Sequence, residues 1–199
     1  SAAIAIPFVA VHASPALTWA AMLAVGTAAG AVWVGIAGFL RYARGVNETI
    51  STLLLNYIAL ALLNHLVSGP MRDYAVSLKP TSWSIPQAYM VGTLPGIGVH
   101  WGLALGAIAC VIAFALLKYT VFGFARGVVG GNPRAAQLVG LPIGRLTLLA
   151  CALGGGAAGL AGAVEIVAVH GAASNSLTVG FCYGGILVAC LARQNPLAI

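Results

Sequence analysis

Charged residues are scarce in this sequence, and acidic residues are the scarcest. Only three of its 199 residues are Asp or Glu and nine are Lys or Arg, so charged residues make up 6% of the chain. Soluble domains carry about 25% charged residues, and this chain cannot supply the polar coat that they need. Disorder requires low hydrophobicity, whereas 61% of these residues are hydrophobic. The composition therefore indicates a polytopic membrane protein.

Catalytic and nucleotide-binding motifs are also lacking. The sequence contains no G-x-S-x-G, no H-E-x-x-H and no paired-carboxylate motif. It has no G-x-x-x-x-G-K-[ST] loop, so any ATP that powers the protein is bound by another chain. Its four histidines and four cysteines show no metal-ligand spacing. We expect no catalytic residue, no metal and no cofactor held by this chain.

Long apolar runs are what the sequence does have. A helix that crosses a membrane takes about 20 residues, and runs near that length lie at 16–40, 50–67, 101–117 and 146–169. Shorter apolar pieces at 2–11 and 180–192 are interpreted as partial spans. The sequence thus predicts an all-α fold, a polytopic transmembrane helical bundle. Both ends of the chain lie in apolar sequence, so we expect one transmembrane domain over 1–199 that is incomplete at both ends.

Basic residues orient this bundle. Seven of the nine fall after the first span, between the third and fourth spans, or after the last apolar piece: Arg41, Arg44, Lys118, Arg126, Arg134, Arg145 and Arg193. Only Arg72 and Lys79 lie between the second and third spans. By the positive-inside rule the larger set marks the cytoplasmic side. This asymmetry accounts for the net charge of +6, so no nucleic-acid partner is needed.

A short helix is predicted in the cytoplasmic connection between the third and fourth spans. Asn132 suits an N-cap, Pro133 suits the first helical position, and Gly140 suits a helix end. From these residues alone, an ordinary interfacial connector and a docking element for another protein both remain open.

Small residues recur at four-residue spacing within the spans. The pairs are Gly26–Gly30, Gly102–Gly106, Gly155–Gly159 and Ala158–Gly162. Small residues on one helix face allow two helices to approach closely in lipid. We therefore expect a tightly packed bundle.

Polar residues at membrane depth are costly and are the candidates for a solute pathway. Asn56, Tyr57 and Asn64 share roughly one face of the second span. This face either lines a polar path for a hydrogen-bonding solute or bonds neighbouring helices.

The remaining polar candidates lie near the ends of spans. Asn47 and Glu48 suit the N-cap and first-turn acid of the second span, and Glu48 can also pair with Arg41 or Arg44. Glu165, the only acid in the fourth span, either lines a cavity or reaches the outer interface. The candidate pathway residues are Asn47, Glu48, Asn56, Tyr57, Asn64 and Glu165.

Three runs of the sequence resemble one protein family. The run 45–59, GVNETISTLLLNYIA, resembles the signature of bacterial ABC-importer permeases of the branched-chain amino acid, ribose and nucleoside superfamily, closest to the simple-sugar and purine-nucleoside branch. The run 131–140, continued at 157–163, is similar to the cytoplasmic coupling loop and glycine-rich helix of that family. The run 183–199 resembles the final Asn-Pro-Leu segment of that branch.

The resemblance implies a transport subunit that is not an enzyme. Such a permease forms half of a path for nucleosides or simple sugars in the bacterial plasma (inner) membrane. The implied partners are an ABC ATPase subunit, a second permease subunit and an extracytoplasmic substrate-binding protein, together with the lipid bilayer.

The resemblance also implies a role for the short cytoplasmic helix at 132–140, as the coupling helix that docks on the ATPase. Its expected coupling residues are Asn132, Pro133, Arg134, Ala135, Ala136, Gln137 and Gly140. The alternatives are a secondary transporter or channel that needs no ATPase, and a structural membrane partner without a pathway.

Overall fold

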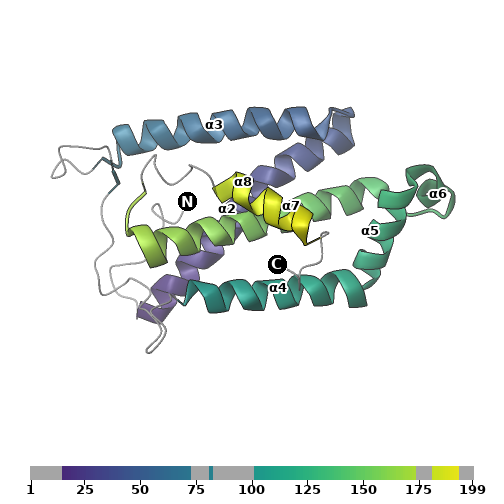
Figure 1. Ribbon diagram of the computed structural model, residues 1–199. Helices are drawn as coiled ribbons and strands as arrows, with labels where there is room; N and C mark the ends of the chain where they lie inside the picture. Colours follow the sequence, from purple (N-terminus) through teal and green to yellow (C-terminus); the bar gives the residue numbers. More distant parts are fainter. Residues whose placement is uncertain (1–14, 73–80, 83–100, 174–180, 193–199) are drawn as a thin grey trace.

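The computed structural model describes residues 15–72, 81–82, 101–173 and 181–192 (Figure 1). In chain order the helices are α2 (Pro15–Arg44), α3 (Glu48–Ser68), α4 (Gly102–Tyr119), α5 (Val121–Gly131), α6 (Pro133–Leu138), α7 (Ile143–Glu165), the π-helical turn η2 (Ile166–His170) and α8 (Phe181–Leu191). The described residues hold no strand beyond an isolated antiparallel bridge between Arg72 and Ser82. The expected all-α bundle is confirmed, whereas the piece at 2–11 lies outside the described residues.

Four helical segments are long and apolar enough to cross a membrane: Leu17–Arg44, Glu48–Ser68, Gly102–Tyr119 and Ile143–Ala168. Many of their large apolar side chains are exposed in this chain. Soluble proteins rarely expose such wide apolar surfaces, and helices satisfy their own backbone in lipid. The described chain is therefore a multi-pass membrane bundle.

All four helices extend beyond the apolar runs of the sequence, two of them by three or four residues at one end. α2 continues past Leu40 to Arg44, and α7 begins at Ile143 rather than at Leu146. Arg41 and Arg44 stand in the last turn of α2, where cations favour the negative end of a helix. Helix ends thus follow backbone bonding and not hydropathy alone.

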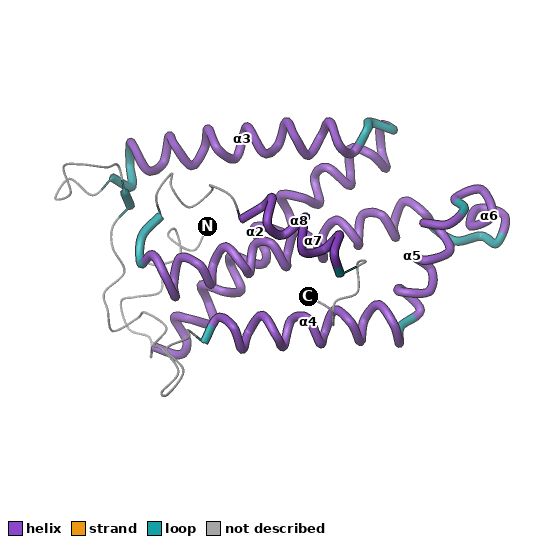
Figure 2. The backbone as a smooth tube through the Cα atoms, viewed as in Figure 1, coloured by secondary structure: helices purple, strands orange, loops and turns teal. Residues whose placement is uncertain are grey.

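The closest helix contact joins α2 and α7, which run antiparallel across the centre of the bundle (Figure 2). A Cβ built on Gly26 would lie 3.1 Å from the carbonyl oxygen of Gly159, and one built on Gly30 would lie 2.8 Å from the Cα of Gly159. A Cβ on Gly155 would strike the carbonyl oxygen of Gly30. Only glycine permits such a backbone approach, so the expected small-residue packing is confirmed for these two pairs.

The other small-residue positions behave differently. A Cβ on Gly102 would lie 2.8 Å from Val164 Cγ1, so α4 also comes close to α7. Cβ atoms built on Gly106 and Gly162 would meet no atom of the described chain within 4 Å. These two glycines lie on faces that the described helices leave open.

The ends of the four candidate membrane spans gather into two groups (Figure 1). The links from α2 to α3 and from α4 to α7 lie at one end, from which α5 and α6 project. We call it the basic end, because the described Lys and Arg residues other than Arg72 belong to it. They are Arg41, Arg44, Lys118, Arg126, Arg134 and Arg145.

An aromatic anchor marks the basic end of α4. Lys118 Nζ lies 5.0 Å from the ring centroid of Phe114 and 5.8 Å from that of Tyr119. Aromatic and basic side chains of this kind are enriched where helices leave a membrane. Their position at the helix end agrees with a membrane boundary there.

The connection between α4 and α7 holds a helix, α5, that the sequence did not indicate. Thr120 caps it by accepting a hydrogen bond from the Gly123 amide at 3.3 Å. The apolar pattern of α5 is interrupted by glycines, which lower the expectation of a helix. At position 123 the close approach to α4 requires glycine, because a Cβ there would strike the carbonyl oxygen of Leu117.

Candidate functional site

The first candidate site is α6, whose start is set by one side chain. Asn132 Oδ1 accepts hydrogen bonds from the amides of Arg134 at 3.1 Å and Ala135 at 3.2 Å. Pro133 follows as the first helical residue, where its missing N–H costs nothing. The predicted N-cap and the predicted proline position are confirmed.

The end of α6 is a Schellman motif. The amide of Gly140 donates to the carbonyl of Gln137 at 3.0 Å, and the amide of Leu141 donates to the carbonyl of Ala136 at 3.0 Å. Gly140 has a φ of 77°, in the left-handed region that favours glycine. The predicted helix end is therefore confirmed, and α6 is closed at both termini.

The surface of α6 combines polar and apolar groups. Arg134 and Gln137 are exposed, whereas Ala136 is fully buried. Sequence reasoning missed two neighbours, Leu138 and Val139, which are 90% and 76% exposed. The available signal was the presence of two large apolar residues directly before a helix-ending glycine in a membrane-external segment.

The second candidate site begins at the start of α3, again at the basic end. Asn47 caps α3 by accepting from the Thr49 amide at 3.0 Å. Glu48 forms an ion pair with Arg41, which confirms one of the two predicted partners. Its other oxygen accepts a hydrogen bond from Cys151 Sγ at 3.4 Å. Glu48 therefore contacts both α2 and α7.

The middle of α3 carries the polar face. Asn56, Tyr57 and Asn64 are all exposed, with Tyr57 at 68%. The buried residues of α3 are Ser51, in its first turn, and Val67, in its last. The three polar side chains therefore lie on accessible surface of the described chain.

Glu165 lies at the opposite end of the bundle from Asn47 and Glu48. Its Oε1 is 3.4 Å from His170 Nδ1 across the π-helical turn η2. A π-turn holds about 4.4 residues, which brings two side chains five residues apart onto nearly the same face. The structure therefore separates the six pathway candidates into three places: the start of α3, exposed positions farther along α3, and the end of α7.

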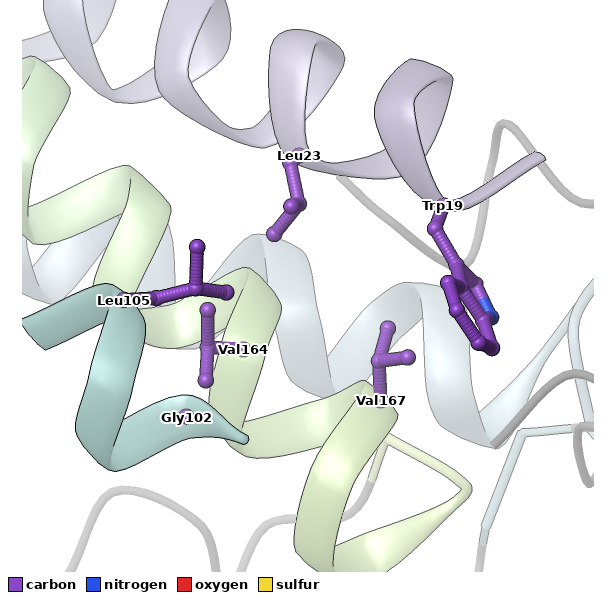
Figure 3. Close-up of a pocket in the computed structure, with 6 residues that line it drawn as sticks. All are labelled: Trp19, Leu23, Gly102, Leu105, Val164 and Val167. Atoms are coloured by element: carbon purple, nitrogen blue, oxygen red, sulfur yellow. The ribbon is translucent and has the colours of Figure 1, made fainter. Parts of the chain in front are cut away.

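A small crevice lies between α2, α4, α7 and η2 (Figure 3). Its cavity volume is about 20 Å³, near the minimum that holds one water molecule. It is lined by apolar groups of Trp19, Leu23, Gly102, Leu105, Val164 and Val167. A polar solute finds neither room nor hydrogen bonds there. Among the described residues no three His, Cys, Asp or Glu side chains gather as a metal site either.

The four helices that are long and apolar enough to cross a membrane define the class of the chain as a multi-pass membrane protein. Residues 2–199 match the sequence profile of a family described as branched-chain amino acid transport system / permease component. The chain belongs to this family of permease components. The resemblance stated from its three sequence runs is thereby confirmed.

Three relatives carry the names of ABC transporter permease proteins. The chain is 30% identical over 190 residues to the glucose ABC transporter permease protein TsgB13 of Haloferax volcanii, covering 89% of this chain and 50% of that protein. It is 28% identical over 180 residues to the guanosine permease protein NupP of Bacillus subtilis, covering 89% and 52%. It is 28% identical over 190 residues to the nucleoside permease protein NupB of Lactococcus lactis, covering 88% and 50%.

The chain thus spans about half the length of the curated relatives it matches. No solved structure shows a significant match to it.

Proposed function

We propose that this protein is the permease subunit of an ATP-driven ABC importer for nucleosides or simple sugars. It forms half of the translocation path and is not itself an enzyme. A separate ATPase subunit binds and hydrolyses the ATP, so the permease needs no cofactor of its own. The names of the relatives, which specify glucose, guanosine and nucleosides, support this class of solute.

The observation that carries the proposal is the closed helix α6 at the basic end. Asn132 and the Schellman motif at Gly140 hold α6 in one conformation, and it projects beyond the candidate spans. Its exposed Arg134, Gln137 and Leu138 suit the mixed polar and apolar surface of a protein contact. A secondary transporter or channel has no need of such a docking helix.

The coupling role belongs in this proposal to the whole segment around α6. Its residues are Asn132, Pro133, Arg134, Ala135, Ala136, Gln137, Leu138 and Gly140. Asn132, Ala136 and Gly140 set its shape, while Arg134, Gln137 and Leu138 meet the ATPase.

The polar face of α3 supplies the proposed path. Asn56 and Asn64 offer amide donors and acceptors, and Tyr57 adds a phenol, all at exposed positions of α3. Polar side chains at membrane depth are retained where they bind one another or a polar solute. A second permease subunit completes the path, and an extracytoplasmic substrate-binding protein delivers solute to the opposite end. The positive-inside rule assigns the basic end to the cytoplasm of a bacterial plasma membrane.

Co-purification tests the coupling assignment. The chain is expressed with the ATPase encoded beside its gene, and the complex is solubilised and isolated through a tag on the permease. We expect Arg134→Glu and Ala135→Trp to lower the yield of co-purified ATPase at least about tenfold. A tenfold loss corresponds to about 1.4 kcal/mol of binding free energy. Arg126→Glu, an equal charge change on exposed α5, is the matched control and should bind normally.

Two results count against the proposal. If the wild-type chain never retains the ATPase, the ABC assignment fails. If all three variants retain it equally, the contact lies elsewhere than α6.

A further inference from the structure

α6 and α7 are joined by a short, fully bonded corner. The amides of Gly140 and Leu141 close the end of α6, and the amide of Ile143 donates to the carbonyl of Leu141 at 2.9 Å. The next turn is bonded too, since the amide of Leu146 donates to the carbonyl of Pro142 at 3.1 Å. A displacement of α6 is therefore passed to the first turn of α7.

α7 is in turn closely fitted to α2 from that first turn onward. A Cβ on Gly144 would strike the ring edge of Tyr42, so the ring rests directly on the α7 backbone. A Cβ on Gly38 would lie 3.0 Å from Cys151 Cβ, and the glycine pairs farther along α2 and α7 are closer still. α2 and α7 thus form a tightly packed pair, to which the bonded corner joins α6, and we call these three helices the coupling unit.

α3, which carries the polar face, is held to this unit at its first residue. Glu48 pairs with Arg41 of α2 through one oxygen and accepts from Cys151 of α7 through the other. Its side chain is about one-third exposed, so it lies at the boundary rather than in an open path. Of the two described acidic residues, Glu48 alone lies at the basic end, since Glu165 ends α7.

We propose that Glu48 is a positioning residue that fastens α3 to the coupling unit, so that a movement of α6 also shifts the polar face of α3. This inference rests on the proposed function and assigns Glu48 a role different from lining the path. The carboxylate suits the task because its two oxygens bond two different helices at once. A single-acceptor group can hold only one of them.

Coupling efficiency is the decisive measurement. The permease–ATPase complex is reconstituted in liposomes, and the solute taken up per ATP hydrolysed is measured with radiolabelled guanosine and glucose. We expect Glu48→Ala to keep complex yield and ATP hydrolysis near wild type while the ratio falls at least about fivefold, the lower end of usual coupling between sites. The double variant Arg41→Glu/Glu48→Arg re-forms the ion pair with α2 but not the hydrogen bond from Cys151, because a guanidinium has no acceptor, so it should recover only part of the ratio. Arg44→Ala, an exposed basic residue of the same helix end, is the control.

A purely structural role gives a different pattern. Complex yield, hydrolysis and uptake then fall together, the ratio stays constant, and the proposal is overturned. An unchanged ratio in Glu48→Ala with normal yield also overturns it.

Hydrogen exchange separates this proposal from the proposed function, because it needs no ATPase. In the purified chain, Glu48→Ala and Arg41→Ala should each raise amide exchange over 51–55 in α3 and leave α7 unchanged. Arg41→Ala keeps the first-turn acid, so its effect does not come from the helix dipole. If exchange over 51–55 stays at wild-type level, Glu48 does not fasten α3. If exchange rises but the wild-type chain retains no ATPase, the fastening holds while the proposed function and the transmission fail.

Discussion

The seam between α2 and α7 offers a sharp test at Gly30. A Cβ at this position would lie 2.8 Å from the Cα and 2.9 Å from the N of Gly159, and would strike the carbonyl oxygen of Gly155. These are backbone atoms of another helix, so no side chain can rotate away. Gly30→Ala therefore forces the two helices apart.

The magnitude follows from the geometry. Ordinary van der Waals contact begins near 3.4 Å, whereas the Cβ of an alanine at position 30 would lie 2.8 Å from Gly159 Cα. The two helices must therefore separate by about 0.6 Å at this contact, and by more at the Gly155 carbonyl oxygen. Overpacking of this kind costs about 1–3 kcal/mol. Alanine also gains up to about 1 kcal/mol over glycine in a helix, which partly offsets the clash.

Gly35→Ala on the same helix is the matched control, since its Cβ would meet no atom of the described chain within 4 Å. The helix-propensity gain is common to both variants, so their difference isolates the overpacking cost of about 1–3 kcal/mol. Reversible unfolding of the purified chain by SDS in mixed micelles, followed by circular dichroism, measures both free energies of unfolding. If the two variants agree within about 0.5 kcal/mol, the range of neutral surface substitutions, the close backbone contact is refuted.

Three further predictions concern other parts of the chain. Asn132→Ala should weaken α6 by about 0.5–2 kcal/mol, seen as faster exchange of its first amides; unchanged exchange would mean that the cap contributes nothing. Ser82→Ala leaves the buried Ala173 amide without its acceptor at 2.8 Å, so the SDS midpoint should fall by the equivalent of about 1–3 kcal/mol; an unaltered midpoint contradicts this. Asn56→Leu should lower guanosine uptake at normal ATPase yield, whereas Ile58→Val, away from the polar face, should not; equal uptake in both removes Asn56 from the path.

Local features of the site were predictable from neighbouring residues. The start of α6 needs only an Asx side chain and two nearby amides, and its end needs only a residue that tolerates positive φ. Asn132 and Gly140 satisfy these requirements within a few residues of sequence. The same holds for Asn47 at the start of α3.

Features that depend on pairing between distant segments were not predictable. Small-residue spacing appears on several spans, but only the pairs of α2 and α7 face each other, while Gly106 and Gly162 have open faces in the described chain. The spacing of small residues predicts which face of a helix allows a close approach. It does not predict which two such faces contact each other. α5 was missed because its glycines resemble those of a loop until the α4 carbonyl that Gly123 accommodates is known.

Glu48 shows the division most clearly. The sequence by itself determined that an acid stands in the first turn after an N-cap and near two arginines, because these relations span few residues. Only the tertiary structure decided that Arg41 is the partner and that Cys151, more than a hundred residues away in α7, bonds the other oxygen. The composition by itself indicated a membrane protein, because the few charged residues cannot form the polar surface that a soluble protein needs. The assignment of Glu48 to a helix junction rather than an open path required the packing of α2 against α7, which depends on distances between backbones that no local pattern records.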